Sequence, residues 1–294
     1  MQPPVRVWRP QPSHPDGPMR LDREQHLALA LARECGALAL TYQTGELDTR
    51  EKPDEAGPVT RADTEVNARI VSALRSAFPD DDIIAEESGA EVRGRARCWY
   101  IDPIDGTSEY ARGEPDWAVH IGLCVDGEPV LGVVHEAGAG RLCWGLRWGG
   151  EVVATLETNG VAAPLRPSDR GPGALQVVSS KSHASPKIGS AMRALGIPDA
   201  RNLRVGSTGV KMMAVARGVA DLYIHPSRGT SLWDTCAPHA VLAAAGGVLT
   251  DVRGEPLTYD LAHLKNEFGL LASHGPHHAA IVEALRPIVG TWFV

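Results

Sequence analysis

Hydrophobic positions near the start of the chain recur every three to four residues in two stretches, 22–40 and 62–78. This period is typical of amphipathic helices. Asp22, with Gln25 three residues later, is an N-cap signal for the first helix. The residues expected to face inward are Leu27, Leu29, Ala30, Leu31, Leu38 and Leu40 in the first helix and Val66, Ile70, Val71, Leu74 and Phe78 in the second.

Short apolar runs replace the helical period further along the chain and predict β-strands. Asp126-Gly127 between two of these runs is a hairpin signal. The polar stretch 41–57 is expected to be a mobile loop. The predicted strands cover residues 83–85, 98–102, 118–125, 129–135 and 141–146.

The second half of the chain begins after a segment, 163–173, that carries proline and glycine. A strand near Val177 and four helices are predicted there, at residues 188–195, 210–215, 237–245 and 278–285. The pattern indicates a mixed α/β protein, with an α+β domain over 19–168 and an α/β domain over 169–294. Residues 1–18 hold several prolines and no apolar core, so a disordered extension is expected there.

Composition excludes some classes of function. A formal net charge of -7 argues against a general nucleic-acid binder. Five cysteines without a C-x-x-C pair favour reduced thiols in a cytoplasmic protein over disulfides or a zinc cluster. Nothing resembles a signal peptide, and no apolar run is long enough to span a bilayer, so no membrane partner is expected.

The segment WYIDPIDGT, residues 99–107, carries the strongest chemical signal. An apolar strand leads into Asp102, Pro103 is expected to turn the chain, and Asp105 follows three residues after the first acid. Gly106 allows close backbone approach, and Thr107 offers a hydroxyl beside exposed N–H groups. An isolated motif of this kind is usually an Asp-rich turn. Here both acids can face one point and form a metal–phosphate site.

Further acids stand beside apolar stretches rather than in solvated charge runs. Glu86 and Glu87 end a short strand, Asp63 closes VTRAD, and Asp234 opens an alanine-rich helix. Two carboxylates about 5 Å apart repel by roughly 3 kcal/mol at an effective dielectric of about 20, so such a cluster needs cations or protons. Oxygen ligands select hard ions, and Mg²⁺ is the expected cofactor.

Four motifs together, VTxAD, EES, DPIDGT and WDxxxxxAxxxxAGG, resemble the inositol monophosphatase family of Mg²⁺-dependent, lithium-sensitive phosphatases. The resemblance runs from about Leu21 to the end of the chain. It implies a layered αβαβα sandwich with the site between the two halves. Members are often dimers, so a homodimer is an expectation of the resemblance.

The resemblance also implies the roles of individual residues. Glu86, Asp102 and the carbonyl of Ile104 would hold one metal, and Asp102, Asp105 and Asp234 a second. Glu86 would support a third, loosely held ion, so two to three Mg²⁺ are expected. Asp63 and Thr107 would orient and deprotonate a water. Gly106 and Thr107 would contact the phosphate.

Within the family, the segments DWAVHIGL, SSKSH, GSTGVKM and ADLY resemble the bisphosphate nucleotidase branch. That branch removes the 3′-phosphate of 3′-phosphoadenosine 5′-phosphate, a by-product of sulfate assimilation. The resemblance places Ser180, Lys181 and His183 against the nucleotide, together with Lys211 and His225. Lone basic residues are more often solvated surface groups, so these assignments are weaker than the metal ligands.

Two departures from the family's sequence patterns leave the identity of the substrate undecided. His225 stands where inositol phosphatases carry an acid and several nucleotidases an arginine. The stretch 52–60 has one residue more than the nucleotidase pattern and lacks its serine, so Lys52 and Asp54 stay outside the catalytic set. His120 and Trp117 are interpreted as core or cleft-wall residues rather than catalysts.

Three functions therefore remain after the sequence is read. The leading hypothesis is a 3′(2′),5′-bisphosphate nucleotidase acting on a small phosphorylated nucleotide. The second is an inositol-1-phosphate or broad sugar-phosphate phosphatase with the same machinery. The third is a phosphate-sensing protein without turnover, which the presence of Asp63, Thr107 and every metal carboxylate argues against.

Overall fold

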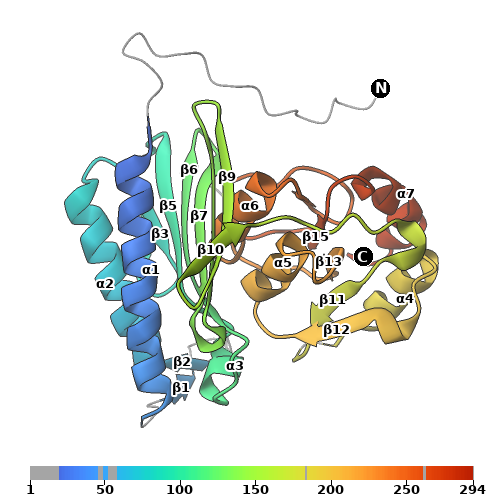
Figure 1. Ribbon diagram of the computed structural model, residues 1–294, viewed down its shortest axis with the longest axis horizontal. Helices are drawn as coiled ribbons and strands as arrows, with labels where there is room; N and C mark the ends of the chain where they lie inside the picture. Colours follow the sequence, from blue (N-terminus) through green and yellow to red (C-terminus); the bar gives the residue numbers. More distant parts are fainter. Residues whose placement is uncertain (1–19, 46–48, 52–57, 183, 261–262, 294) are drawn as a thin grey trace.

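Five layers of alternating helices and sheets make up the protein (Figure 1). The computed structural model describes residues 20–45, 49–51, 58–182, 184–260 and 263–293. The expected extension over 1–18 therefore lies outside the described residues, as do Lys52, Asp54 and His183. The αβαβα sandwich that the resemblance implied is confirmed.

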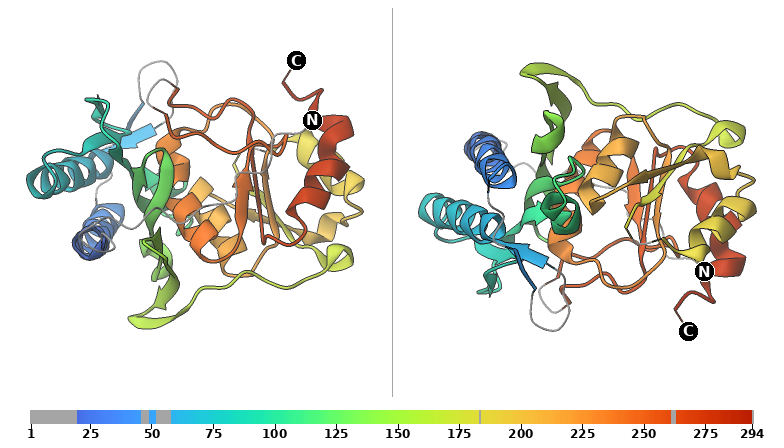
Figure 2. Two further views of the ribbon diagram at one scale, coloured as in Figure 1. Left: turned by 90° about the horizontal axis from the view of Figure 1, so that it is seen from above. Right: turned by 90° about the horizontal axis from the view of Figure 1, so that it is seen from below.

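The outer helical layers are well separated in space (Figure 2). Helices α1 (Asp22–Gln43) and α2 (Arg61–Ala77) cover one face of the larger sheet. Helices α5 (Thr208–Ala216) and α6 (Leu232–Ala244) fill the space between the two sheets. Helices α4 (Pro186–Ala194) and α7 (His278–Val289) close the far side. A short helix, α3 (Thr107–Ala111), follows the DPIDGT segment and was not expected.

In the described ranges, eight strands form the larger sheet in the order β10-β9-β8-β7-β6-β5-β3-β4. The pair β3–β5 is parallel and the other pairs are antiparallel. The strands are β3 (Asp82–Ala85), β4 (Gly89–Glu91), β5 (Arg97–Asp105), β6 (Ala118–Val125), β7 (Glu128–Glu136), β8 (Arg141–Trp148), β9 (Glu151–Thr158) and β10 (Val161–Pro164). The five predicted strands are present. The three that were not predicted are the exposed edge strands β4 and β10 and the partly exposed β9, which lies between β8 and β10.

The smaller sheet has the order β12-β11-β13-β15-β14 in the described part of the chain. Its strands are β11 (Val177–Ser180), β12 (Asn202–Val205), β13 (Leu222–His225), β14 (Val248–Thr250) and β15 (Leu270–Ser273). Only the strand near Val177 was predicted, because runs of three or four residues show no clear period. The predicted helices of this half are present with shifted ends. Among the described residues, short 3₁₀ turns lie at Ala137–Ala139, Pro172–Ala174 and Asp199–Arg201.

The inward face of α1 differs from the predicted one. Of the six expected residues, Leu31 is buried and Ala30 is exposed, while the others are partly buried against the core: Leu27, Leu29, Leu38 and Leu40. The buried stripe is made of small residues, which let the helix approach the sheet closely: a Cβ at Gly36 would lie 2.3 Å from the His135 ring. The helix also begins at Asp22 itself, with Leu21 at the cap position. In α2, the five predicted residues are all buried.

The loop expected over 41–57 was also partly wrong. Helix α1 continues to Gln43, and strand β1 (Thr49–Glu51) pairs antiparallel with β2 (Pro58–Thr60). The remaining residues of that stretch include 46–48 and 52–57, which lie outside the described residues.

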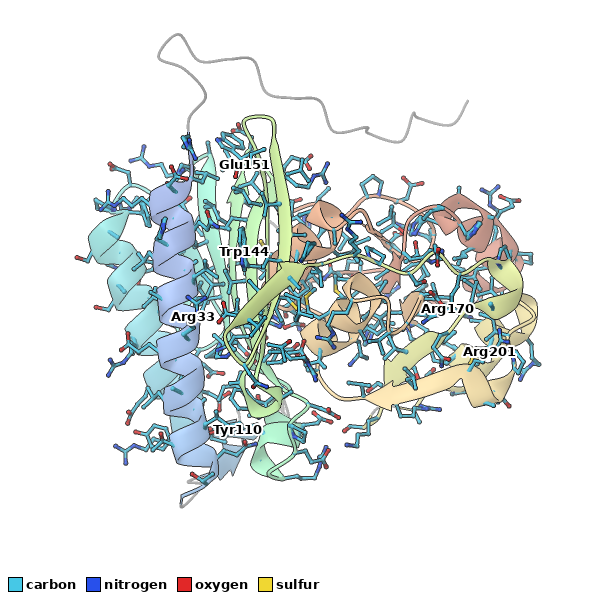
Figure 3. The ribbon with its side chains drawn as sticks, in the orientation of Figure 1. Arg33, Tyr110, Trp144, Glu151, Arg170 and Arg201 are labelled. Carbon is cyan, nitrogen blue, oxygen red and sulfur yellow. The ribbon has the colours of Figure 1, made fainter. Side chains whose placement is uncertain are left out.

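The chain crosses from the larger to the smaller sheet along residues 165–176, and Arg170 lies in this segment (Figure 3). The buried carboxylate of Asp221 holds the segment through hydrogen bonds. Asp221 is fully buried and accepts hydrogen bonds from the Ser168 hydroxyl and from the backbone N–H of Gln176. Arg170 donates to both of its carboxylate oxygens. Among the helices that the structure describes, none is both long and apolar enough to cross a lipid bilayer.

Candidate active site

Strand β5 delivers Asp102, Ile104 and Asp105 to one end of the larger sheet. The strand was expected to end at Asp102 with a turn at Pro103, but it continues to Asp105. Its pairing with β6 shifts register between the two acids, which is the irregularity that lets both side chains stay near one point. The backbone N–H of Ile104 donates to Asp102 Oδ1 at 3.1 Å, and both acids are buried.

Gly106 ends this strand with a φ of +95°. A Cβ at this position would lie 2.9 Å from the carbonyl oxygen of Asp116, so the left-handed conformation and the close contact both require glycine. The turn places Thr107 at the start of α3. Its hydroxyl lies 3.0 Å from the carbonyl of Ile104 and 3.3 Å from Asp63 Oδ1.

Asp63 reaches this point from the first turn of α2. It forms a capping box with Thr60, whose backbone N–H donates to Asp63 Oδ2 at 2.8 Å and whose hydroxyl donates to the same oxygen at 2.6 Å. The other oxygen is left to face Thr107. Asp63 and Thr107, predicted to act together, are therefore in contact.

Asp234 reaches the site in the same way from α6. Its Oδ2 accepts from the backbone N–H of Ser231 at 2.7 Å, completing a second capping box. The pattern Ser/Thr-x-x-Asp is visible in the sequence at both Thr60–Asp63 and Ser231–Asp234, and it could have revealed these two helix starts.

Asp105 is held from the other half of the chain, by the N-terminus of α5. The hydroxyl of Ser207 donates to its Oδ2, as does the backbone N–H of Gly209 at 2.6 Å, while the N–H of Thr208 lies 3.1 Å from Oδ1. Ser207 has a φ of +52°, a strained conformation for a residue with a side chain. Sequence reasoning missed these contacts, because nothing local links residue 105 to residues 207–209.

The carboxylates form one electrostatic group. Burial raises the pKa of Asp102 well above its ordinary value, and the charges of Glu86, Asp105 and Asp234 raise it further. Burial likewise raises the pKa of Asp234, with Asp105 and Glu86 adding to the shift. Side-chain hydrogen bonds join Asp102 to Glu86 and to Asp234. Two carboxyl groups can share such a bond only when one of them holds a proton, so this group of acids keeps a proton when no cation is bound.

This group fits hard divalent cations. Its donors are all oxygens, the ligands that Mg²⁺ prefers, and its acids repel one another unless protons or cations compensate them. Within the described ranges, no three His, Cys, Asp or Glu side chains are already arranged around one ion position. The carboxylates hydrogen-bond to one another and to backbone N–H groups at helix N-termini.

Asp63 has its own electrostatic setting. Burial raises its pKa to about 6, against the hydrogen bonds from Thr60, which lower it. Glu87 and Glu86 raise the pKa slightly more. A carboxylate poised near neutrality is suited to accept a proton from water.

Lys211 is the one strongly buried cation near the acids in the described chain. Its ammonium lies 5.4 Å from the centre of the Tyr223 ring, and burial lowers its pKa to about 8. Asp105 is the first of several acids that oppose this shift. His225 ends β13 and its ring centre lies 6.5 Å from that of Tyr223. Both basic residues predicted to contact substrate are thus neighbours of Tyr223.

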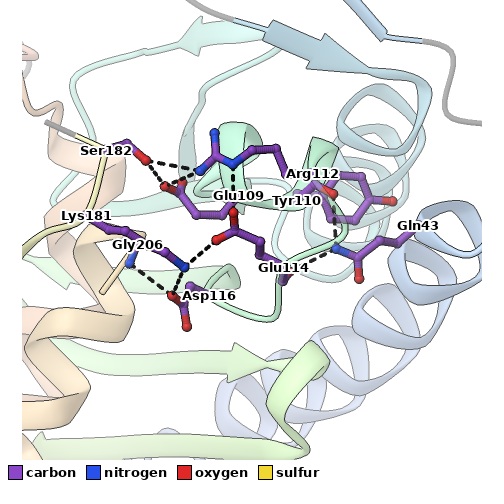
Figure 4. Close-up of polar contacts among 9 residues, drawn as sticks. All are labelled: Gln43, Glu109, Tyr110, Arg112, Glu114, Asp116, Lys181, Ser182 and Gly206. Carbon is purple, nitrogen blue, oxygen red and sulfur yellow. Dashed lines mark hydrogen bonds and ion pairs between the residues drawn. The ribbon is translucent and has the colours of Figure 1, made fainter. Parts of the chain in front are cut away.

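Lys181 belongs to an exposed ion-pair cluster between α3 and the end of β11 (Figure 4). Its ammonium lies 2.5 Å from Glu114 and 3.4 Å from Asp116. The cluster also joins Ser182 and Arg112 to the buried carboxylate of Glu109, and joins Asp116 to the backbone of Gly206. Sequence reasoning named Lys181 but missed the three acids and the arginine around it.

The other expected residues differ in their positions. Ser180 ends β11, and its carbonyl accepts a hydrogen bond from Arg204. Trp117 is fully buried with its ring at right angles to that of Tyr110, as expected for a core residue. His120 is fully buried as well, but it lies against Asp105.

Comparisons with known proteins identify a family and named relatives that are similar to this chain. The model of the inositol monophosphatase family matches residues 21–289. The chain is 37% identical over 235 residues to a protein of Escherichia coli K12 named 3′(2′),5′-bisphosphate nucleotidase CysQ, covering 78% of this chain and 91% of that protein. It is 30% identical over 287 residues to human 3′(2′),5′-bisphosphate nucleotidase 1, covering 84% and 89%.

Solved structures give the same picture of the fold. The inositol monophosphatase of Anabaena superposes with a TM-score of 0.73 at 27% identity, covering 92% of this chain and 97% of that one. The IMPase of Thermotoga maritima superposes with a TM-score of 0.76 at 25% identity, covering 92% and 99%. The likeness therefore includes both sheets and the elements that carry the acids.

Proposed function

The chain belongs to the inositol monophosphatase family, and on that premise we propose that it is a Mg²⁺-dependent 3′(2′),5′-bisphosphate nucleotidase. The family is metal-dependent, generally using Mg²⁺. The proposed reaction releases the 3′-phosphate of 3′-phosphoadenosine 5′-phosphate and leaves AMP. This reaction would serve sulfate assimilation.

One observation carries the proposal: the electrostatically linked acids at the end of β5 lie beside the contact between Asp63 and Thr107. Glu86, Asp102, the carbonyl of Ile104, Asp105 and Asp234 would hold two to three ions. A binding protein without turnover would not need a buried, proton-accepting carboxylate next to this group, so the contact supports an enzyme rather than a phosphate sensor.

The residues divide the work of hydrolysis. Bound Mg²⁺ supplies positive charge that lowers the pKa of water and neutralises the phosphoryl group. Asp63, held by Thr60 and in contact with Thr107, orients the attacking water and accepts its proton. Gly106 and Thr107 receive the phosphate on backbone and hydroxyl groups. The water oxygen forms the new P–O bond as the bond between phosphorus and the 3′-oxygen breaks. The leaving oxygen takes a proton from solvent, and Asp63 returns its proton to solvent.

The distal parts of the substrate would be recognised by cations outside the acid cluster. Lys211 and His225 stand near Tyr223, and Ser180 and Lys181 stand at the end of β11. A bisphosphate nucleotide needs positive charge at a second phosphate, whereas an inositol monophosphate has one phosphate only. Lys211 and Lys181 would be the cations that meet this second phosphate, and their presence supports the nucleotide.

The substrate class is tested by comparing kcat/KM on 3′-phosphoadenosine 5′-phosphate, inositol 1-phosphate and fructose 1,6-bisphosphate. We expect the nucleotide to be preferred by at least about tenfold, which corresponds to about 1.4 kcal/mol of transition-state stabilisation. Chelation with EDTA is the blank for each substrate. A preference of more than about tenfold for inositol 1-phosphate would overturn the assignment.

A preference for inositol 1-phosphate also has support in the structure and the sequence. Solved inositol monophosphatases superpose over nearly the whole chain, and His225 does not provide the fixed charge that an arginine would give a nucleotide phosphate. An inositol-1-phosphate or broad sugar-phosphate phosphatase is therefore the second candidate, with the same acids in the same roles.

Lys181→Ala tests nucleotide recognition at the exposed ion-pair cluster. The lysine is partly exposed, and its ion pairs contribute little stability, so the variant should fold normally. We expect KM for 3′-phosphoadenosine 5′-phosphate to rise roughly tenfold, about 1.4 kcal/mol, with little change for inositol 1-phosphate. Lys187→Ala is the matched control, since its ammonium contacts the carbonyl of Trp292. Equal losses on both substrates would remove Lys181 from recognition.

The cysteines and the family resemblance indicate the compartment and the assembly of the enzyme. All five cysteines are free and buried, and the sulfurs of Cys124 and Cys236 lie 3.6 Å apart without a bond. Free thiols this close are suited to a reducing compartment such as the cytoplasm. A homodimer stays a prediction from the family.

A further inference from the structure

His120 is a buried histidine whose ring nitrogens have few hydrogen-bond partners in the described residues. It lies in β6, its ring is fully buried, and Nε2 lies 3.3 Å from Oδ2 of Asp105. Within the described residues neither ring nitrogen has a hydrogen bond of ordinary geometry, and the polar groups that face the ring are Asp105 Oδ2 and the backbone of Trp233. Buried polar side chains without a partner are rare, so each one calls for an explanation.

The packing around this ring depends on a glycine. A Cβ at Gly209 would lie 2.0 Å from His120 Nε2 and 3.2 Å from Asp105 Oδ2. The N-terminus of α5 can therefore reach both groups only because residue 209 has no side chain. The same glycine donates its N–H to Oδ2 of Asp105. The ring, the helix end and the carboxylate oxygen form one tightly packed contact.

The ring is also suited to donate a proton toward this oxygen. Its Nε2 faces Oδ2 of Asp105 across 3.3 Å, which is within reach of a hydrogen bond. A neutral imidazole has one N–H donor and one bare acceptor nitrogen. Beside a carboxylate oxygen only the donor is favourable, which places the hydrogen on Nε2. The backbone of Trp233, next to Asp234, also lies against the ring.

We propose that His120 is a positioning residue that hydrogen-bonds to Asp105 and fixes the rotation of this carboxylate before a divalent cation binds. The inference rests on the proposed function, in which Asp105 is a metal ligand. Groups that hold a ligand in place tune metal affinity, and their loss typically weakens it 10–100-fold. His120 itself touches no substrate in this proposal.

The test is calorimetric titration of the metal-free full-length chain with Mg²⁺ alone, without substrate. His120→Gln carries an amide where Nε2 stands, whereas the amide of His120→Asn is too short to reach Asp105. We expect the Gln variant to bind Mg²⁺ within about threefold of the original protein, and the Asn and Leu variants to bind roughly 10–100-fold more weakly. The Gln–Asn comparison decides the question even if His120→Leu does not fold.

Thermal melting in EDTA separates positioning from stability. His278→Gln is the matched control, because this buried histidine contacts Thr250 and Ser273 away from the acids. It should lower the melting temperature without changing Mg²⁺ affinity. Equal affinity in the original protein and His120→Asn would overturn the inference, as would equal losses in the Asn and Gln variants. If the unmutated chain binds no Mg²⁺, the proposed function itself fails.

Discussion

Asp102→Asn is expected to abolish Mg²⁺-dependent phosphate release, lowering kcat/KM by roughly 10³-fold or more, about 4 kcal/mol of transition-state stabilisation. Asp102 is the acid that the others surround: Glu86, Asp105 and Asp234 all act on its pKa. In the proposed site it would bridge two ions, so asparagine removes charge from both. The measurement is phosphate release from 3′-phosphoadenosine 5′-phosphate at saturating Mg²⁺.

The same variant should be at least as stable as the original protein when no cation is present. A raised folded-state pKa means that the stability from protonated Asp102 is complete below about pH 3.8 and is lost as pH rises through the folded pKa. Asparagine does not titrate. We therefore expect Asp102→Asn to gain in melting temperature relative to the original protein between pH 5 and 8 in EDTA, and Mg²⁺ to remove that advantage.

Asp82→Asn provides a matched control on the neighbouring strand β3. Asp82 is also fully buried, but it accepts hydrogen bonds from the backbones of Arg93 and Arg95, away from the other acids. Its loss should destabilise the protein in EDTA and leave turnover nearly unchanged. Retained Mg²⁺-dependent activity in Asp102→Asn would contradict the proposed site. A melting temperature below that of the original protein in EDTA would contradict the account of uncompensated charge.

The sequence could predict the acids of the site because each stands at a boundary that local patterns mark. Asp63 and Asp234 open helices, Glu86 follows the strand β3, and Asp102 and Asp105 belong to one short motif. Apolar strands next to charged residues are visible without any knowledge of the fold. The layered arrangement came from the family resemblance, since the short strands of the second sheet carry too few residues to show a period.

The rest of the site depends on contacts between distant residues. The bulge in β5 is set by its pairing with β6, and the donors on Asp105 come from residues about a hundred positions later. The sequence predicts only that His120 is a core or cleft-wall residue, because its position in an apolar strand gives no sign of which group faces it. Its contact with Asp105 arises only when α5 packs against β6 through Gly209.

Asp63→Asn is expected to lower kcat by roughly 10²–10⁴-fold while changing KM and Mg²⁺ affinity little. Asparagine can keep the capping bond from Thr60 and lie beside Thr107, but it cannot accept a proton from water. Burial raises the pKa of Asp63 to about 6, and activity should fall as pH drops through the pKa of this group. Nearby cations favour the charged form of Asp63, so the acidic limb of the pH–activity profile should lie below pH 6 with Mg²⁺ bound. This limb should be absent in Asp63→Asn.

Glu65→Gln is the matched control, because it removes one charge from a partly exposed position on the same helix. Glu65 contacts Tyr42 and Arg61 rather than the acid cluster, so kcat should stay within about twofold. Single-turnover kinetics and Mg²⁺ calorimetry then separate the two roles open to Asp63. A proton acceptor loses the chemical step alone, whereas a metal ligand loses Mg²⁺ affinity in proportion. Turnover retained within tenfold in Asp63→Asn would contradict the assignment of this carboxylate as the base.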